Sequence, residues 1–381
     1  MPRHPVTLVE SSAQGFVAFI SENTITVTDS TGKTIASTQA TEDPSVARIP
    51  AAPGKGSIRA ATFSLTGKYF AVCTNDKSLV IYATNGWTIQ RQLTSEKRTN
   101  ALAFDPSETH LLAGDKFGDC TQISIVEDTP GQVLLGHVSI VCALAFTHTS
   151  PPFVLSCDRD EKLRISHYPS AYNIRAFGLG HTEFVTSVAT LSGAPHLCLT
   201  GAGDATLRLW DLDGGLLRTV ELEPLLQKYY AEGRARCALA NSFEDRTAAT
   251  QRYGVLRVRA AESLGAFIAV VERFPVVIVL PLQDGELGEP VLVDVAGPPT
   301  DVAPVDRGFV VAYAEGQRLA DAYVRDAAGA FVRDLEVSEA IARSVQTREV
   351  EEEVQVPSIF VWGNKMYLER PQGDNDDEND E

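Results

Sequence analysis

Residues 180–211 read GHTEFVTSVATLSGAPHLCLTGAGDATLRLWD, and this stretch decides the fold. It opens on a Gly-His step and closes on a Trp-Asp step, and its last ten residues alternate polar and apolar side chains as a strand does. Another Gly-His step, Gly136-His137, stands 44 residues upstream. Segments like the final ten residues recur at intervals of 41, 43 and 44 residues: TNDKSLVIYA (74–83), DKFGDCTQIS (115–124), DRDEKLRISH (158–167) and AGDATLRLWD (202–211).

This spacing predicts a repeat architecture. A period of about 40–45 residues with Gly-His near its start and Trp-Asp at its end is the signature of a WD repeat. Each repeat folds into a four-stranded blade, and the blades pack around a central channel. We therefore predict an all-β WD40 β-propeller over residues 1–370, with seven blades closed by N- and C-terminal strands. Residues 371–381 are predicted to be a disordered acidic tail.

Each repeat also predicts a buried polar set. In WD repeats a histidine, a strand Ser or Thr, a turn aspartate and a tryptophan hydrogen-bond to one another, and buried polar groups must be satisfied in this way. These His and Asp side chains resemble catalytic pairs, but a propeller repeats them where no chemistry occurs, so a structural role is predicted. The residues assigned to the two sets are His181, Thr200, Asp204 and Trp210 in one repeat and His137, Ser156 and Asp160 in the preceding repeat, where Ser166 replaces the tryptophan.

The remaining segments follow the period less closely. Four blades are expected from about 58 to 219, preceded by three short strands in 16–38 and an insertion at 39–57. A second insertion is expected at 221–260, beginning with a helix near 222–231. Later blades are expected around LGAFIAVVE and PVVIVLPL and over about 291–326, and the last would pair strands near 330–335 and 357–362 with the N-terminal ones. That pairing would remove exposed sheet edges.

Composition limits the function. The net charge is −17, and residues 349–381 hold eleven of the acids against Lys365 and Arg370, so strong binding to nucleic acid by this chain alone is not expected. The six cysteines form no CxxC pair and are expected to be reduced core thiols. The N-terminus has no secretory signal pattern and no apolar run reaches membrane-spanning length, so a soluble intracellular protein is expected. The common nucleotide-binding and hydrolase motifs are absent, which argues against an enzyme.

Five motifs narrow the function further. They occur in a fixed order between 111 and 211: LLAGDKFGD (111–119), LLGHVS (134–139), DRDEKLRIS (158–166), LGHTEFV (179–185) and GDATLRLW (203–210). Together they resemble the non-catalytic WD-repeat subunit of the eukaryotic tRNA (guanine-N7) methyltransferase, the Wuho-type family. The resemblance covers about a quarter of the chain, and DRDEKLRIS followed by LGHTEFV is its most specific part.

The resemblance implies a scaffold without catalytic, cofactor-binding or metal-binding residues of its own. Such a chain would form a heterodimer with a Rossmann-like catalytic subunit that carries S-adenosylmethionine, and would stabilise it for N7 methylation of a variable-loop guanine in tRNA. Direct contact with tRNA would be marginal, and the location would be the nucleus, with the cytoplasm as a second site. The alternatives are a generic WD-repeat adaptor, such as a ubiquitin-ligase substrate receptor or a DNA-repair partner, and an enzyme with a site in the channel, because fold does not fix function.

The resemblance also implies which residues meet the partner. The family's basic residues that face the catalytic subunit correspond to Lys116 and Arg164, and Arg159 and Lys162 extend that basic cluster. Charge-assisted pairing with partner carboxylates would be the physical basis. The alternative is that these side chains are structural or merely solvated, because Arg208 occupies the register of Arg164 one repeat later. The basic stretch 228–259 either contacts tRNA phosphates or is a solvated connection, and the second is favoured because its charge is not dense.

Overall fold

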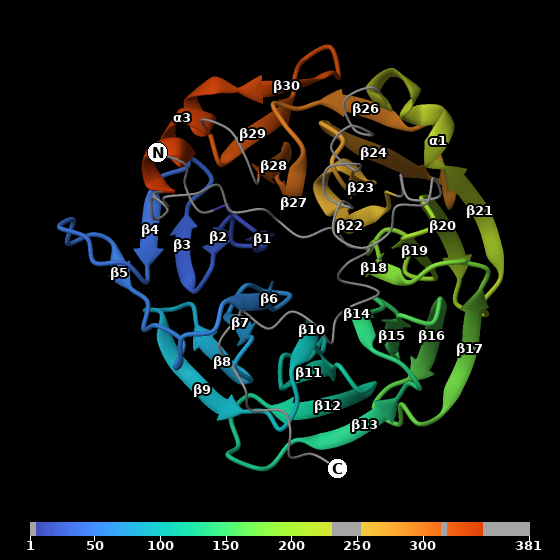
Figure 1. Cartoon of the computed structure of the whole chain (residues 1–381), viewed down its shortest axis with the longest axis horizontal. Helices are drawn as coiled ribbons and strands as arrows, with labels where there is room; N and C mark the ends of the chain where they lie inside the picture. Colours follow the sequence, from blue (N-terminus) through green and yellow to red (C-terminus); the bar gives the residue numbers. More distant parts are fainter. Residues whose placement is uncertain (1–4, 231–252, 314–317, 346–381) are drawn as a thin grey trace, which may run out of the picture.

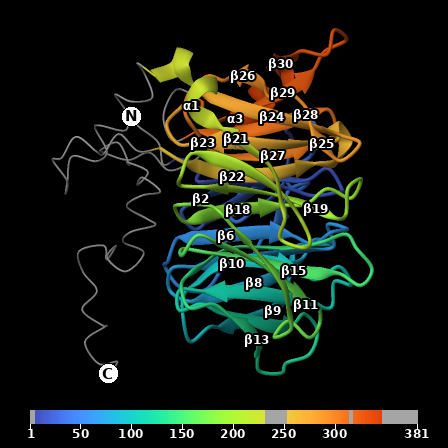
Figure 2. The same ribbon diagram turned by 90° about the vertical axis from the view of Figure 1, so that its right-hand side faces the viewer.

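A computed structural model describes residues 5–230, 253–313 and 318–345, and these form seven sheets around a central axis (Figure 1). The predicted seven-bladed β-propeller is confirmed. Figure 2 shows the same ring edge-on. No helix in the described part of the chain is long and apolar enough to cross a membrane.

The blades follow one another along the chain, and the first strand of each lies nearest the axis (Figure 1). Blade 1 holds β1 (Leu8–Ser11), β2 (Val17–Ser21), β3 (Thr24–Thr28), β4 (Thr34–Ser37) and β5 (Ala47–Arg48). Blade 2 holds β6 (Ile58–Phe63), β7 (Tyr69–Thr74), β8 (Ser78–Ala83) and β9 (Thr88–Thr94). Blade 3 holds β10 (Thr99–Phe104), β11 (His110–Asp115), β12 (Asp119–Ser124) and β13 (Gln132–Gly136).

The second half of the ring continues this order. Blade 4 holds β14 (Val141–Phe146), β15 (Phe153–Asp158), β16 (Lys162–His167) and β17 (Ile174–Leu179), and blade 5 holds β18 (Val185–Ala189), β19 (Leu197–Ala202), β20 (Thr206–Asp211) and β21 (Leu216–Glu221). Blade 6 holds β22 (Val255–Ala261), β23 (Ala266–Val271), β24 (Val276–Gln283), β25 (Glu286–Leu287) and β26 (Val291–Asp294). Blade 7 holds β27 (Pro299–Val305), β28 (Gly308–Tyr313), β29 (Ala320–Arg325) and β30 (Phe331–Asp334). The helices that lie wholly within the described residues are α1 (Leu222–Leu225) and α3 (Leu335–Ser344), with 3₁₀ turns at Gln227–Tyr229 and Glu262–Leu264.

The core lies between the blades. Each blade buries both faces of its sheet, so its second strand is largely apolar and lies inside: all residues of β7, β15, β19 and β23 are buried. The outermost strands β9, β13, β17 and β21 are largely exposed, which matches their mixed sequences. The five cysteines within the described residues are buried and unpaired, as predicted, and burial raises the pKa of Cys73, Cys142 and Cys198 to about 12.

The predicted pairing of C-terminal with N-terminal strands is wrong. Blade 1 is built entirely from the N-terminal strands and blade 7 from residues 299–334, with β30 paired to β29. Residues 357–362 lie outside the described part. The ring is closed by packing, because apolar side chains of blade 1, including Val9 and Phe19, meet Val310 of blade 7 and Ile341 of α3. A strand exchange is unnecessary where the N-terminal strands already complete a blade.

A buried ionic clasp adds to this closure. Arg259 on β22 of blade 6 donates from Nη2 to Glu10 Oε1 of blade 1 at 2.5 Å and lies 3.3 Å from Asp301 Oδ2 of blade 7. The Val9 backbone N–H also donates to Asp301 Oδ2, at 3.1 Å. Removing one member of such a set would leave the others buried without their partners, so the clasp holds blades 6, 7 and 1 in one arrangement.

The second insertion, predicted over 221–260, is shorter than expected. The blade predicted over 291–326 also begins and ends elsewhere. Residues 255–261 form β22, the innermost strand of blade 6, while β26 completes that blade and blade 7 begins at β27. The strand β22 was not predicted from the sequence because Arg257 and Arg259, which reach toward Asp301, interrupt its apolar pattern. Of the predicted helix near 222–231, α1 and the following 3₁₀ turn are present, and residues 231–252 lie outside the described part.

Candidate partner-binding surface

Blade 5 contains the hydrogen-bonded set that its sequence predicts. His181 Nδ1 lies 2.9 Å from Asp204 Oδ2 and its Nε2 lies 2.7 Å from Thr200 Oγ1. Trp210 Nε1 donates to the same hydroxyl at 2.8 Å. Burial alone would raise the pKa of Asp204, but hydrogen bonds from His181, Thr182 and Thr206 outweigh it and hold the pKa below its usual value. His181 and Asp204 therefore have a structural role within blade 5.

Blade 4 uses a different aspartate from the one predicted. His137 Nε2 lies 2.7 Å from Ser156 Oγ as expected, but its Nδ1 lies 2.9 Å from Oδ2 of Asp158. Asp160 is exposed and pairs with Arg159 at 3.5 Å, so its assignment to the buried set is wrong. The carboxylate comes from the end of β15, two residues earlier than sequence alignment with Asp204 suggests, and Asp158 also accepts from the Lys162 backbone N–H.

This shift yields a first prediction. We expect Asp158→Ala to lower the free energy of unfolding by roughly 1–3 kcal/mol, because His137 loses its buried partner and the β15–β16 turn loses an acceptor. Asp160→Ala should change it by less than about 0.5 kcal/mol, as exposed substitutions do. Urea unfolding of both variants measures the difference, and equal effects of the two substitutions would contradict the assignment.

Arg164, the other basic residue of the motif, is bound within blade 4. Its side chain is buried, with 6% of the residue exposed. Nε donates to Ser166 Oγ at 2.9 Å, Nη1 to the Gly136 carbonyl at 2.7 Å and Nη2 to the Ala171 carbonyl at 2.8 Å. Burial lowers the pKa of this guanidinium. In the propeller alone, Arg164 therefore makes its contacts inside blade 4, and its role at a partner surface stays a prediction.

The reason is a substitution within the repeat. Ser166 pairs with Val154 in the register at which Trp210 pairs with Cys198 one blade later, so blade 4 lacks the indole that fills this space in blade 5. The guanidinium of Arg164 bonds directly to the hydroxyl that replaces it. The equivalent Arg208 in blade 5 stays at the margin, where its Nε donates to Thr206 Oγ1 at 3.2 Å.

The other three predicted basic residues share one rim of the ring. In blade 3 the register pairs Asp119 with Gly136, and in blade 4 it pairs Lys162 with Leu179. In each blade, the turn between the second and third strands therefore lies on the same rim of the ring as the end of the outermost strand. This end carries Lys116 in the β11–β12 turn, Arg159 in the β15–β16 turn and Lys162 at the start of β16. All three are partly exposed.

Phe117 is the centre of this surface. Its ring is 52% exposed, and two ammonium groups lie over it, Lys97 Nζ at 4.8 Å and Lys116 Nζ at 4.9 Å from the ring centroid. Lys97 also binds Asp119 at 3.1 Å, a hydrogen bond that raises the pKa of the lysine. The β11–β12 turn packs closely against the next loop because residue 118 is a glycine. Its φ is +108°, and a Cβ at this position would clash with the His137 carbonyl oxygen.

That neighbouring loop adds a second apolar residue. Val138 is 98% exposed, and the Arg159 backbone N–H donates to the Ile140 carbonyl at 2.9 Å, which brings the loop beside the β15–β16 turn. Lys162 Nζ donates to the Asp160 carbonyl at 2.9 Å, and Leu179 opposite it is 63% exposed. We call the resulting surface the rim patch; it comprises Lys97, Lys116, Phe117, Val138, Arg159, Lys162 and Leu179.

The sequence predicted three of the four basic residues of the rim patch, but neither Lys97 nor the three apolar residues. A signal was present: Phe117 occupies the register where Asp76, Asp160 and Asp204 stand in the other repeats, and a phenylalanine in a tight polar turn is unusual. Grouped exposed apolar side chains with a polar rim mark protein–protein interaction sites.

The basic stretch 228–259 is less available than its composition suggests. Lys228 binds Asp294 at 3.1 Å, and Arg257 and Arg259 lie on β22 and pair with Asp301. The remaining arginines, Arg234, Arg236, Arg246 and Arg252, lie outside the described residues. Residues 255–259 thus belong to a strand of blade 6, so the favoured interpretation of this stretch as a solvated connection is wrong for them.

Comparison with known proteins relates this geometry to a family. The family model described as the tRNA methyltransferase TRM82 WD40 domain matches residues 126–321. The tRNA (guanine-N(7)-)-methyltransferase non-catalytic subunit WDR4 of Mus musculus is 40% identical over 167 residues, which cover 44% of this chain and 40% of that protein. The subunit TRM82 of Eremothecium gossypii is 30% identical over 258 residues, covering 64% and 56%. The chain thus spans about half the length of these relatives.

A solved structure shows the same fold at low sequence identity. A chain of the "Crystal Structure of Mitotic Checkpoint Complex" aligns with a TM-score of 0.61 at 17% identity, covering 81% of this chain and 83% of that one. At this identity the likeness concerns the propeller alone.

Proposed function

Because the chain belongs to the family of the tRNA methyltransferase TRM82 WD40 domain, we propose that it is the non-catalytic subunit of a tRNA (guanine-N7) methyltransferase. In this role it binds and stabilises a catalytic subunit in a heterodimer that methylates N7 of a variable-loop guanine in tRNA. The observation that carries the proposal is the family match over residues 126–321, which spans the rim of blade 4.

The rim patch is the surface we propose for the catalytic subunit. Its apolar centre, Phe117 and Val138, can be buried by a partner, and the lysines and Arg159 around it can pair with partner carboxylates. Arg164 supports this surface from inside, since it fixes the carbonyl of Gly136 just before the loop that carries Val138.

The two subunits are proposed to have different roles. We propose that S-adenosylmethionine and the chemistry belong to the catalytic subunit, and that the complex works in the nucleus, with the cytoplasm as a second site. The acidic balance of this chain opposes binding to tRNA phosphates, so the basic contacts with tRNA come mainly from the partner. The names of the relatives favour this function over a ubiquitin-ligase receptor or a DNA-repair adaptor.

A reconstitution tests the proposal. The full chain, purified alone, is expected to transfer no methyl group from S-adenosylmethionine to tRNA, and co-expression with the candidate catalytic subunit of the same organism is expected to yield a copurifying 1:1 complex with activity. The measurement is incorporation of labelled methyl groups, with the catalytic subunit alone as the control. Activity of this chain by itself, or no copurification, would overturn the proposal.

A further inference from the structure

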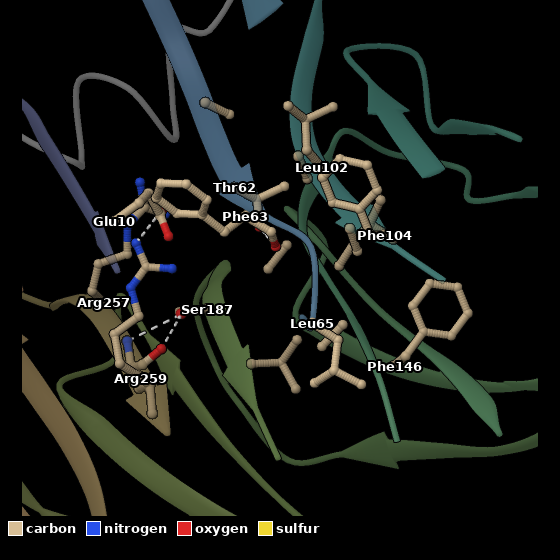
Figure 3. A pocket seen from close by; sticks show the side chains of 18 of the residues that line it. Glu10, Thr62, Phe63, Leu65, Leu102, Phe104, Phe146, Ser187, Arg257 and Arg259 are labelled. Atoms are coloured by element: carbon tan, nitrogen blue, oxygen red, sulfur yellow. Dashed lines mark hydrogen bonds and ion pairs between the residues drawn. The ribbon is translucent and has the colours of Figure 1, made fainter. Parts of the chain in front are cut away.

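The channel of the propeller contains a cavity of about 440 Å³, within the range of small-molecule sites. Residues of blades 1 to 6 line it, and its two sides differ in chemistry (Figure 3). It reaches the turns between the first and second strands, where Leu65, Pro106 and His148 lie. This is the rim opposite the rim patch, and although the cavity extends along the inner strands to Asn100 near the start of β10, no residue of the rim patch lines it.

One side of the cavity is apolar because the inner strands of three consecutive blades carry alanine. Ala60, Ala101 and Ala143 occupy equivalent positions after the bulge of β6, β10 and β14, and all three line the cavity. Each of these strands ends in a phenylalanine that also lines it: Phe63, Phe104 and Phe146. Small side chains here leave space that larger ones would fill, since protein interiors are otherwise closely packed.

The other side of the cavity is charged. Figure 3 places Arg257, Arg259 and Glu10 together, away from Phe104 and Phe146. Arg259 is held by the clasp, whereas the closest approach of Arg257 to Asp301 is by Nε, at 3.6 Å, and 30% of the Arg257 side chain is exposed. Within the described residues its terminal nitrogens have no hydrogen-bond acceptor.

A second donor lines the same cavity. Asn100 is buried, with 7% of the residue exposed, and its Oδ1 accepts a hydrogen bond from Arg59 Nη2 at 3.1 Å. Its Nδ2 has no hydrogen-bond partner in the part of the chain that the structure describes. A buried donor without an acceptor costs free energy that a ligand oxygen would recover.

We propose that the channel binds a small amphipathic carboxylate, with its carboxylate oxygens on the guanidinium of Arg257 and its apolar body along the alanines and phenylalanines. An anion is selected because Glu10 and Asp301 engage Arg259 and only the Nε side of Arg257, which leaves the guanidinium end of Arg257 to the cavity, and an arginine fork matches a carboxylate geometrically. An apolar body is selected because the opposite wall offers methyl groups and rings rather than hydrogen-bonding groups. The proposal is independent of the methyltransferase assignment.

Titration of the full chain with octanoate by isothermal calorimetry tests it, with 1-octanol as the uncharged counterpart. Octanoate is expected to bind at one site and at least tenfold more tightly than 1-octanol. Arg257→Gln is expected to weaken octanoate at least tenfold, and Ala145→Leu, which fills the cavity, to abolish binding. Arg175→Gln, at an exposed pair on β17, is the matched control and should bind like the unmodified chain.

Circular dichroism melts verify that each variant is folded. No octanoate binding, equal binding of 1-octanol, or an unchanged affinity of Arg257→Gln would each overturn the proposal. Loss of binding in Ala145→Leu together with normal binding in Arg257→Gln also overturns it, because the cavity would then select apolar bulk without regard to charge.

Discussion

Replacing Arg164 with leucine is expected to lower the free energy of unfolding of the isolated chain by about 3 kcal/mol or more. The guanidinium donates to Ser166 Oγ and to the carbonyls of Gly136 and Ala171, and leucine offers a donor to none of them. Ser166 and Ala171 are buried, and each buried acceptor left without a partner costs roughly 1–3 kcal/mol. Chemical denaturation of the chain without its partner measures this, because a residue that acted only at an interface would leave the free chain unchanged.

Two further variants complete this test. Arg159→Leu, five residues away on the exposed turn, is the control and should shift the free energy of unfolding by less than about 0.5 kcal/mol. Arg164→Lys should recover only part of the loss, because one ammonium cannot reproduce the planar fork that reaches three acceptors. Wild-type stability of Arg164→Leu would instead favour a role of this residue at the partner surface alone.

Most of the fold could be predicted because its signals are local and periodic. The blades at 58–219 repeat a turn and an alternating strand at a fixed interval, and the structure places them at Ile58–Glu221. The errors lie where side chains serve distant partners. Arg257 and Arg259 make β22 look like a polar insertion, and their reason for being charged, Asp301 and Glu10, lies in blades 7 and 1.

The site was predicted in part for the same reason. The positions of Lys116, Arg159 and Lys162 on one rim follow from the repeat register, so their grouping was within reach of the sequence. The burial of Arg164 was not, because it depends on the space left by Ser166 and on carbonyls of two loops that the register alone does not place. Asp158 and Asp160 are two residues apart near the end of β15, and the geometry of the β15–β16 turn decides which of them reaches His137.

The double charge reversal Lys116→Glu with Lys162→Glu is expected to raise the Kd for the catalytic subunit about a hundredfold or more while the propeller stays folded. Both side chains are partly exposed on the rim patch, so neither is needed inside a blade. Reversing both would place acids against the partner carboxylates proposed to face them, at a cost of roughly 3 kcal/mol for the pair. Because Lys116 also covers the ring of Phe117, its loss removes one of the two cations that hold that ring.

Calorimetry or a pull-down with the catalytic subunit measures this loss, at low and at high salt, since contacts between exposed charges weaken as salt rises. The matched control is Lys33→Glu with Lys68→Glu, which makes the same change in net charge on exposed turns of the opposite rim and should leave the Kd unchanged. A similar loss in the control would mean that net charge, rather than the rim patch, governs association. Unchanged binding of the Lys116 and Lys162 variant, with the fold intact by circular dichroism, would place the partner on another surface.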